Sequence, residues 1–181
     1  MTVVHRNRIY AVFALLGVLA FPASPRALDL GLTPSHVYSL WANINESLIA
    51  ATRTVSSDTN RRNALTALKP NQYSGKKPAD VFVQVGIYRE KLNRLLLVQN
   101  LPLAKQVGQV DGTITPSNVF LNSGHVLNAQ VRWLIVMTGK EQTVSQFYER
   151  HEFSGKTPSD VYGLVDLANR RMDMLLGHAN L

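Results

Sequence analysis

The sequence of 181 residues contains no cysteine. That absence excludes disulfide frameworks, thiolate zinc sites, iron–sulfur clusters, covalently attached c-type haem and thiol nucleophiles. Charged residues are also few, at 17%, whereas hydrophobic residues make up 45% of the chain. A disordered chain would have fewer apolar residues and a larger net charge, so most of this sequence is expected to fold.

The first 27 residues have the pattern of a secretory signal peptide. Arg6 and Arg8 precede an apolar run over residues 9–21, and prolines and small residues follow up to Ala27. The run is shorter than the ~20 residues of a membrane-spanning helix, so cleavage after Ala27 is the first prediction and retention as an anchor the alternative. No later apolar stretch of the sequence reaches that length. We therefore predict a bacterial periplasmic or secreted protein with no transmembrane span after cleavage.

The chain is basic, with 19 Lys and Arg against 12 Asp and Glu. Part of this excess belongs to the predicted signal, because removing residues 1–27 takes away three arginines and no acid and leaves 16 basic residues against 12 acidic ones. An exported protein seldom meets nucleic acid, so no nucleic-acid partner is predicted. The expected partner is an unknown envelope protein or a small ligand, for which an anionic compound is one option.

A short motif recurs four times: a proline, two variable residues, a valine and an aromatic residue. The prolines are Pro34, Pro78, Pro116 and Pro158, spaced by 44, 38 and 42 residues. Alternate copies are most alike, and residues 73–82 and 153–162 are identical at six of ten positions. We interpret the pattern as a tandem duplication of a two-helix unit. Repeat unit 1 covers about residues 32–110 and repeat unit 2 about 114–181, in a single domain over 28–181.

Each copy of the motif has the features of a helix start. A threonine precedes the proline in three copies, and a hydroxyl group before a first-turn proline is a favoured N-cap arrangement. Asp160 lies three residues after Thr157 and forms a capping-box pattern with it. Lys77 replaces the threonine in the second copy, which predicts the weakest cap for that helix.

Apolar residues recur every three or four positions after each start, and no segment after residue 27 has the two-residue period of a strand. The fold class predicted is all-α, a helical bundle of four main helices with short extra helices in the connections at residues 60–68 and 141–150. The predicted apolar stripes contain Val37, Trp41, Ile44, Leu48 and Ala51; Val81, Val85, Tyr88, Leu92 and Leu95; Phe120, Leu127, Val131 and Leu134; and Val161, Val165, Ala168, Met172 and Leu175.

The connections between the predicted helices are about 15 to 20 residues long, whereas bundles usually use 2–8. Their reach is enough for either parallel or antiparallel neighbours. An antiparallel bundle with pseudo-two-fold symmetry between the units is the first choice. Duplicated positions are then expected to be equally buried, Val81 with Val161 and Leu95 with Leu175.

Few residues form a pattern that carries chemistry. The histidines beyond residue 27 have neither the His-x-x-x-His nor the Glu-x-x-His spacing, so no metal site and no cofactor is predicted. Ser123 lies two residues from His125 on a different face of a helix and cannot share a proton with it. No catalytic residue is assigned. Were the protein an enzyme with a site assembled from distant residues, His125 and His151 would be the first candidates. The four histidines beyond residue 27, none of which has a metal-ligand spacing, are His36, His125, His151 and His178.

Two similar turns precede helix starts, Gly75-Lys76-Lys77 and Gly155-Lys156-Thr157. Neither has the earlier glycine of a phosphate-binding loop, so both are interpreted as polar turns, with capture of an anionic group as the alternative. The remaining basic clusters are interpreted as solvated helix faces. These clusters are Arg61-Arg62, then Arg89, Lys91 and Arg94, and finally Arg170-Arg171.

The sequence as a whole favours a non-enzymatic protein of the cell envelope that acts as a ligand-binding or protein-interaction module. An enzyme and a purely structural subunit of an envelope complex are the alternatives. A structural subunit is expected to have a flat, continuous apolar surface and no pocket.

Overall fold

The computed structural model describes residues 29–55, 58–106, 112–139 and 144–177, and within these ranges the chain is all-helical, without a strand. The predicted all-α class is therefore confirmed. The predicted signal peptide, residues 1–27, lies outside the described residues. The elements are α1 (Pro34–Val55), α2 (Thr59–Ala67), α3 (Pro78–Val98), α4 (Pro116–Thr138), the 3₁₀ helix η1 (Ser145–Tyr148) and α5 (Pro158–Leu176).

The helix starts predicted from the motif are confirmed, because α1, α3, α4 and α5 each begin at one of the four prolines. The short helix predicted at residues 60–68 is α2. The second short helix predicted, at residues 141–150, corresponds in the described part of that segment to η1, a single 3₁₀ turn. The C-cap Gly139 of α4 has a φ of 65°, a left-handed conformation that glycine adopts without strain.

The four proline-started helices share one capping arrangement. In each, the side chain two residues after the proline accepts a hydrogen bond from the backbone N–H of the N-cap residue, which otherwise has no partner in the helix. Lys77, the N-cap residue of the helix predicted to have the weakest cap, makes no side-chain cap hydrogen bond. The acceptors are His36 at 3.0 Å, Asp80 at 2.8 Å, Asn118 at 2.9 Å and Asp160 at 2.8 Å.

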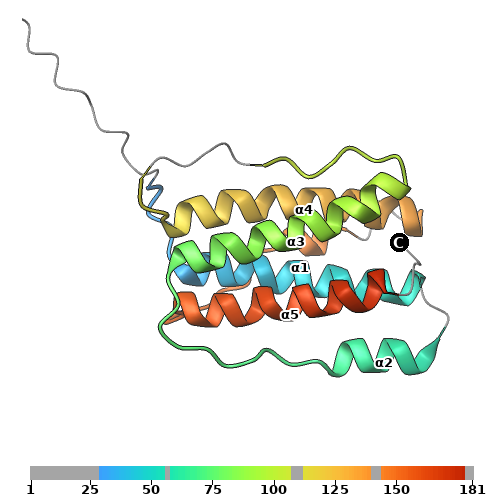
Figure 1. The fold of residues 1–181 in the computed structure, drawn as a ribbon, viewed down its shortest axis with the longest axis horizontal. Coiled ribbons are helices and arrows are strands. Elements are labelled where there is room, and N and C mark those ends of the chain that lie inside the picture. The colour runs from blue at the N-terminus through green and yellow to red at the C-terminus, as the bar shows by residue number, and fades with distance from the viewer. Residues whose placement is uncertain (1–28, 56–57, 107–111, 140–143, 178–181) are drawn as a thin grey trace, which may run out of the picture.

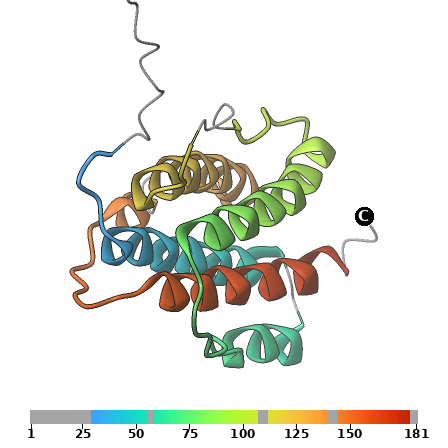
Figure 2. The same cartoon turned by 60° about the vertical axis from the view of Figure 1, so that its left-hand side comes forward.

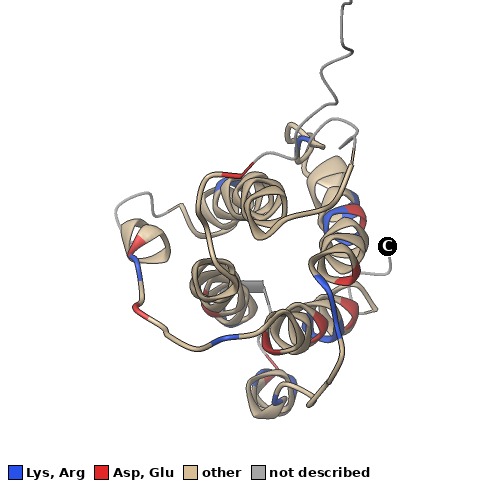
Figure 3. Ribbon diagram, turned by 90° about the vertical axis from the view of Figure 1, so that its left-hand side faces the viewer, with Lys and Arg blue, Asp and Glu red and all other residues tan. Residues whose placement is uncertain are grey.

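Helices α1, α3, α4 and α5 form a ring in which α1 and α3 each contact both α4 and α5 (Figure 3). All four helices begin at the same end of the ring, because their first-turn prolines and valines together line one small apolar depression (Figure 1). The helices are therefore parallel, and the predicted antiparallel arrangement is wrong. Parallel neighbours need connections that return along the whole bundle, as α2 and residues 68–77 together do below α5 in Figure 1. Such returns are why the connections are long.

The core of the ring consists of layers at matching positions. Residues 3, 7, 10, 14 and 17 positions after each proline are all buried. Their alternating spacing of four and three is that of the a and d positions of a heptad, which keeps one face of each helix toward a common axis. As expected, Val81 and Val161 are equally buried, at 1% and 2% exposure, and so are Leu95 and Leu175, at 6% and 7%.

The stripe predicted for α4 differs from the face that meets the bundle axis. The layer positions of α4 include two polar residues, Ser123 and Gln130, both with no exposed surface. Ser123 Oγ accepts a hydrogen bond from Trp41 Nε1 at 2.8 Å, and Gln130 Oε1 accepts one from the Tyr88 hydroxyl. An apolar-periodicity search overlooks such positions because their polar partners come from other helices.

Helix α2 lies outside the ring, beneath α5 in Figure 2, and Arg171 connects it to the bundle. The Arg171 guanidinium donates to Leu65 O at 3.2 Å, to Leu68 O at 3.2 Å and to Asn45 Oδ1 at 2.8 Å. With 5% of its surface exposed, Arg171 is not part of a solvated face, and that interpretation of the Arg170-Arg171 pair is wrong for Arg171. Burial lowers the pKa of this guanidinium below its ordinary value.

Candidate functional site

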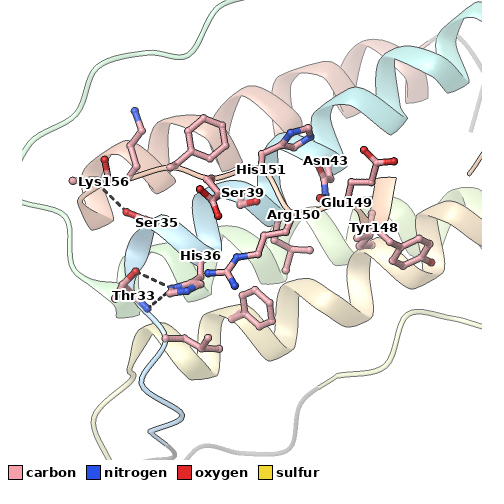
Figure 4. Close-up of a pocket in the computed structure, with 18 residues that line it drawn as sticks. Thr33, Ser35, His36, Ser39, Asn43, Tyr148, Glu149, Arg150, His151 and Lys156 are labelled. Atoms are coloured by element: carbon pink, nitrogen blue, oxygen red, sulfur yellow. Dashed lines mark hydrogen bonds between the residues drawn. The ribbon is translucent and has the colours of Figure 1, made fainter. Parts of the chain in front are cut away.

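A groove of about 1000 Å³ runs between α1 and α4. Segment 148–156, which leads from η1 into α5, forms its remaining wall (Figure 4). The side chains that matter for its chemistry are Thr33, Ser35, His36, Ser39, Leu40 and Asn43 of α1 and its cap, Phe120 and Leu127 of α4, and Tyr148, Glu149, Arg150, His151, Glu152 and Lys156 of the wall segment.

The groove lies between α4 and α1, the one pair of neighbouring helices that lacks an interhelical hydrogen bond found in the other three pairs. The other neighbouring pairs are α1 with α5, α5 with α3, and α3 with α4. In each pair, a side chain eleven positions after the first-turn proline of the first helix donates a hydrogen bond to the second helix. The acceptor lies in the residue six positions after the proline of that second helix. Asn45 donates to Leu164 O at 3.1 Å, and Asn169 donates to Gln84 O at 3.2 Å. Arg89 donates to Asn122 Oδ1 at 3.3 Å.

At the α4–α1 pair, the corresponding positions hold Leu127 and Leu40, which cannot form this bond, and both leucines line the groove. The groove therefore has an apolar floor that the other helix pairs lack at this level. Phe120 of α4 and Tyr148 of η1 add aromatic surface. A concave site with an apolar floor and a few polar groups is typical of small-molecule sites.

His36 presents a hydrogen-bond donor at one end of the groove. Its Nδ1 accepts the Thr33 backbone N–H at 3.0 Å and also lies 2.9 Å from Thr33 Oγ1. A neutral imidazole with Nδ1 as acceptor carries its proton on Nε2. The capping contact therefore sets the tautomer, and Nε2–H is the donor that remains. The Arg150 side chain extends toward His36 in Figure 4.

Segment 148–156 is held against α1 by several contacts. Asn43 Nδ2 donates to Glu149 O at 2.8 Å, and the Lys156 N–H donates to Ser35 Oγ at 3.1 Å. The Phe153 ring packs edge-on against Tyr38, with ring centroids 4.9 Å apart. These contacts fix the wall of the groove without filling it.

Two buried polar atoms at this wall have no hydrogen-bond partner within the described part of the chain, Asn43 Oδ1 and His151 Nε2. Asn43 has 3% of its surface exposed. The Glu46 carboxylate lies 3.8 Å from His151 Nε2, beyond hydrogen-bond distance. Buried polar atoms are nearly always paired, so an unpaired acceptor in the wall of a groove indicates a place for a donor.

The structure separates the two histidines that the sequence offered as catalytic candidates. His151 lines the groove, whereas His125, half-buried on α4, does not. His36, which the sequence gave no role, lies in the groove instead. Its position three residues after a threonine N-cap was a signal in the sequence, because that is the acceptor position of a capping box.

The two glycine–lysine turns have equivalent roles in packing. Lys76 Nζ lies 4.5 Å from the centre of the Tyr162 ring, and Lys156 Nζ lies 4.5 Å from that of Tyr38, both in cation–π contact. The Lys76 N–H donates to Ser159 Oγ at 3.0 Å, as the Lys156 N–H does to Ser35. Protein groups therefore occupy the donors that an anion would have needed at these turns.

Burial and hydrogen bonding shift the pKa of two further groups. Burial raises the pKa of the Tyr148 phenol in the groove above its ordinary value, and the charge of Arg132 opposes this shift. Hydrogen bonds from the Thr157 backbone and side chain lower the pKa of the Asp160 carboxyl. Both groups therefore keep their usual ionisation at neutral pH, with Tyr148 neutral and Asp160 charged.

The described residues contain no group of three or more His, Asp or Glu side chains placed to hold a metal ion. In the same part of the chain, no helix combines the length and apolar character needed to cross a membrane. Comparison of the chain with protein-family models, curated proteins and solved structures finds no match.

Proposed function

We propose that this chain is an exported, non-enzymatic helical protein of the bacterial cell envelope, periplasmic or secreted, which binds a small ligand in the groove between α1 and α4. The groove is the observation that carries the proposal. Its apolar floor, its donor at His36 and its unpaired acceptor at Asn43 together suit a ligand with both apolar and polar parts. A purely structural subunit would not need such a site.

The proposal includes an origin by tandem duplication, giving four main helices from two copies of a two-helix unit. The shared capping arrangement and the matching core layers support it. So do the equivalent contacts of the turns before α3 and α5, in which a lysine N–H donates to a serine next to the first-turn proline of a neighbouring helix. In this view, the ligand groove arose where two of the repeated positions became leucines.

A thermal-shift screen of the purified protein against small envelope metabolites tests the binding function. A ligand present at 100 times its Kd stabilises the folded state by about 2.7 kcal/mol. Such a gain corresponds to an increase in Tm of roughly 5–10 °C for a chain of this size. Tyr148→Ala should reduce the increase, because Tyr148 lines the groove, whereas Val136→Ala should not. The two side chains are matched in exposure, at 52% and 51%.

Export is tested separately by cell fractionation. The full chain should appear in the periplasmic fraction or the medium, and a variant without residues 2–27 should stay in the cytoplasm. Cytoplasmic recovery of the full chain would contradict the export part of the proposal. A screen in which no compound raises Tm, or in which Tyr148→Ala and Val136→Ala respond alike, would contradict the binding part.

A further inference from the structure

The polar groups of the groove are arranged along its length, so they describe the shape of a ligand as well as its chemistry. His36 and Arg150 lie toward one end and Asn43 and Glu149 toward the other (Figure 4). The formal charges of the wall balance, because it carries two cations, Arg150 and Lys156, and two acids, Glu149 and Glu152. The position of each charge, rather than their sum, therefore decides where a charged ligand group can lie.

The end at His36 favours an anionic group. His36 Nε2–H points a donor there, since Nδ1 is occupied by the helix cap. The Arg150 guanidinium has no hydrogen bond or ion pair with another described residue, and it extends toward His36. A guanidinium and a neutral N–H donor together are a suitable pair for a carboxylate. Lys156, in contrast, is engaged with the Tyr38 ring.

The end at Asn43 favours a hydrogen-bond donor. Asn43 Nδ2 is committed to Glu149 O, so the amide orientation is set and Oδ1 remains the unpaired acceptor. His36 and Asn43 are seven residues apart on α1, and two turns of helix rise about 10.5 Å, roughly the span of an extended ten-carbon chain. Between the two ends lies the apolar floor of Leu40 and Leu127.

We infer that the groove binds an elongated amphipathic carboxylate, with the carboxylate at His36 and Arg150, an alkyl body over Leu40 and Leu127, and a hydroxyl donor at Asn43. The chemical class is a medium-chain fatty acid hydroxylated at or near its far end. This inference rests on the proposed function, because it names the ligand class of the same groove.

Isothermal titration calorimetry of the purified protein with four probes tests each part of the ligand. The probes are 10-hydroxydecanoate, 10-methoxydecanoate, decanoate and 1,10-decanediol. The hydroxy acid should bind about 2- to 10-fold more tightly than decanoate, the effect of one neutral hydrogen bond. The methoxy acid should not show this gain, because an ether cannot donate. The diol should bind about 10- to 100-fold more weakly than the hydroxy acid, since it lacks the charged hydrogen bonds.

Two variants test the carboxylate end without disturbing the fold. His36→Glu keeps a capping box with Thr33 and places a negative charge at a helix N-terminus, so the Tm should not fall. Binding of the hydroxy acid should nevertheless weaken by at least 10-fold, because the new carboxylate repels that of the ligand. Arg150→Met should abolish the preference for the hydroxy acid over the diol, and the exposed Arg53→Met should leave it unchanged.

Each result either supports or overturns the inference. Equal affinities for the acid and the diol, a methoxy acid that binds as tightly as the hydroxy acid, or no heat from any of the four probes would overturn it. Failure of the inference is distinct from failure of the proposed function. If the probes fail but another compound raises Tm in a Tyr148-dependent way, the groove is a ligand site of different specificity.

Discussion

The buried pair of Tyr88 and Gln130 makes a sharp prediction about the core. The Tyr88 hydroxyl donates to Gln130 Oε1, and Gln130 Nε2 donates to Ile44 O at 2.9 Å and to Ser47 Oγ at 2.6 Å. Neither Tyr88 nor Gln130 has any exposed surface. Burial raises the pKa of the Tyr88 phenol well above its ordinary value, so the hydroxyl stays a neutral donor across the physiological range.

Removing one partner of this pair leaves the other buried without a hydrogen bond. Gln130→Leu leaves the Tyr88 hydroxyl unpaired and should lower the free energy of unfolding by about 1–3 kcal/mol. Tyr88→Phe leaves Gln130 Oε1 unpaired and should have a similar effect. In the double variant neither polar group remains, so its loss should be smaller than the sum of the single losses by about 1–2 kcal/mol. Ser47 still donates to Ile44 O, so Gln130→Leu leaves that hydroxyl paired.

Urea denaturation followed by far-UV circular dichroism measures the four free energies of this cycle, and each kcal/mol also corresponds to roughly 2–4 °C in Tm. The matched control combines Gln130→Leu with Ser123→Ala. These two residues lie seven positions apart on α4, about 10.5 Å, and have different partners, so their effects should add within about 0.5 kcal/mol. If the losses in the free energy of unfolding of Tyr88→Phe and Gln130→Leu simply add in the double variant, the reasoning that their hydrogen bond couples the layers is refuted.

Three further predictions concern packing, pH and the attachment of α2. Gly163→Ala should destabilise the protein by about 1–3 kcal/mol, because a Cβ there would lie 2.5 Å from the backbone oxygen of Asn71. Gly124→Ala has open space around it and should stabilise α4 by about 0.5–1 kcal/mol. Thermal melts in which both variants change Tm in the same direction would contradict this. Asp160 has a folded-state pKa below its ordinary value of 3.8, so the charged carboxylate stabilises the folded protein above that pH, and this contribution is lost as the pH falls through the folded pKa. Asp160→Asn should therefore reduce the fall of Tm on acidification. If Tm falls with pH in the variant as it does in the unaltered protein, this prediction is contradicted. Arg171→Met should speed amide hydrogen exchange in α2 much more than in α3, because its guanidinium bonds two carbonyl groups at and after the end of α2; equal acceleration in both helices would show that Arg171 acts only on global stability.

Local chemistry in the sequence determined where the helices begin. A proline has a preset φ and no N–H to lose, and an acceptor two residues later pairs the N-cap N–H, so each start is specified within a few residues. The same holds for the buried valine of the motif, whose position after the proline places it on the axis in all four helices. These features do not depend on which helices are neighbours.

Direction and neighbours were decided only by the tertiary structure. Connections of this length can reach either end of a helix, so the sequence left the parallel arrangement open. Ser123 and Gln130 can be buried in the core because Trp41 and Tyr88, from helices distant in sequence, donate hydrogen bonds to them. The groove has the same origin, because Leu40 and Leu127 are 87 residues apart and form a floor only when α1 and α4 pack together. A single chain shows its local capping and periodicity, whereas a site between helices depends on which faces meet.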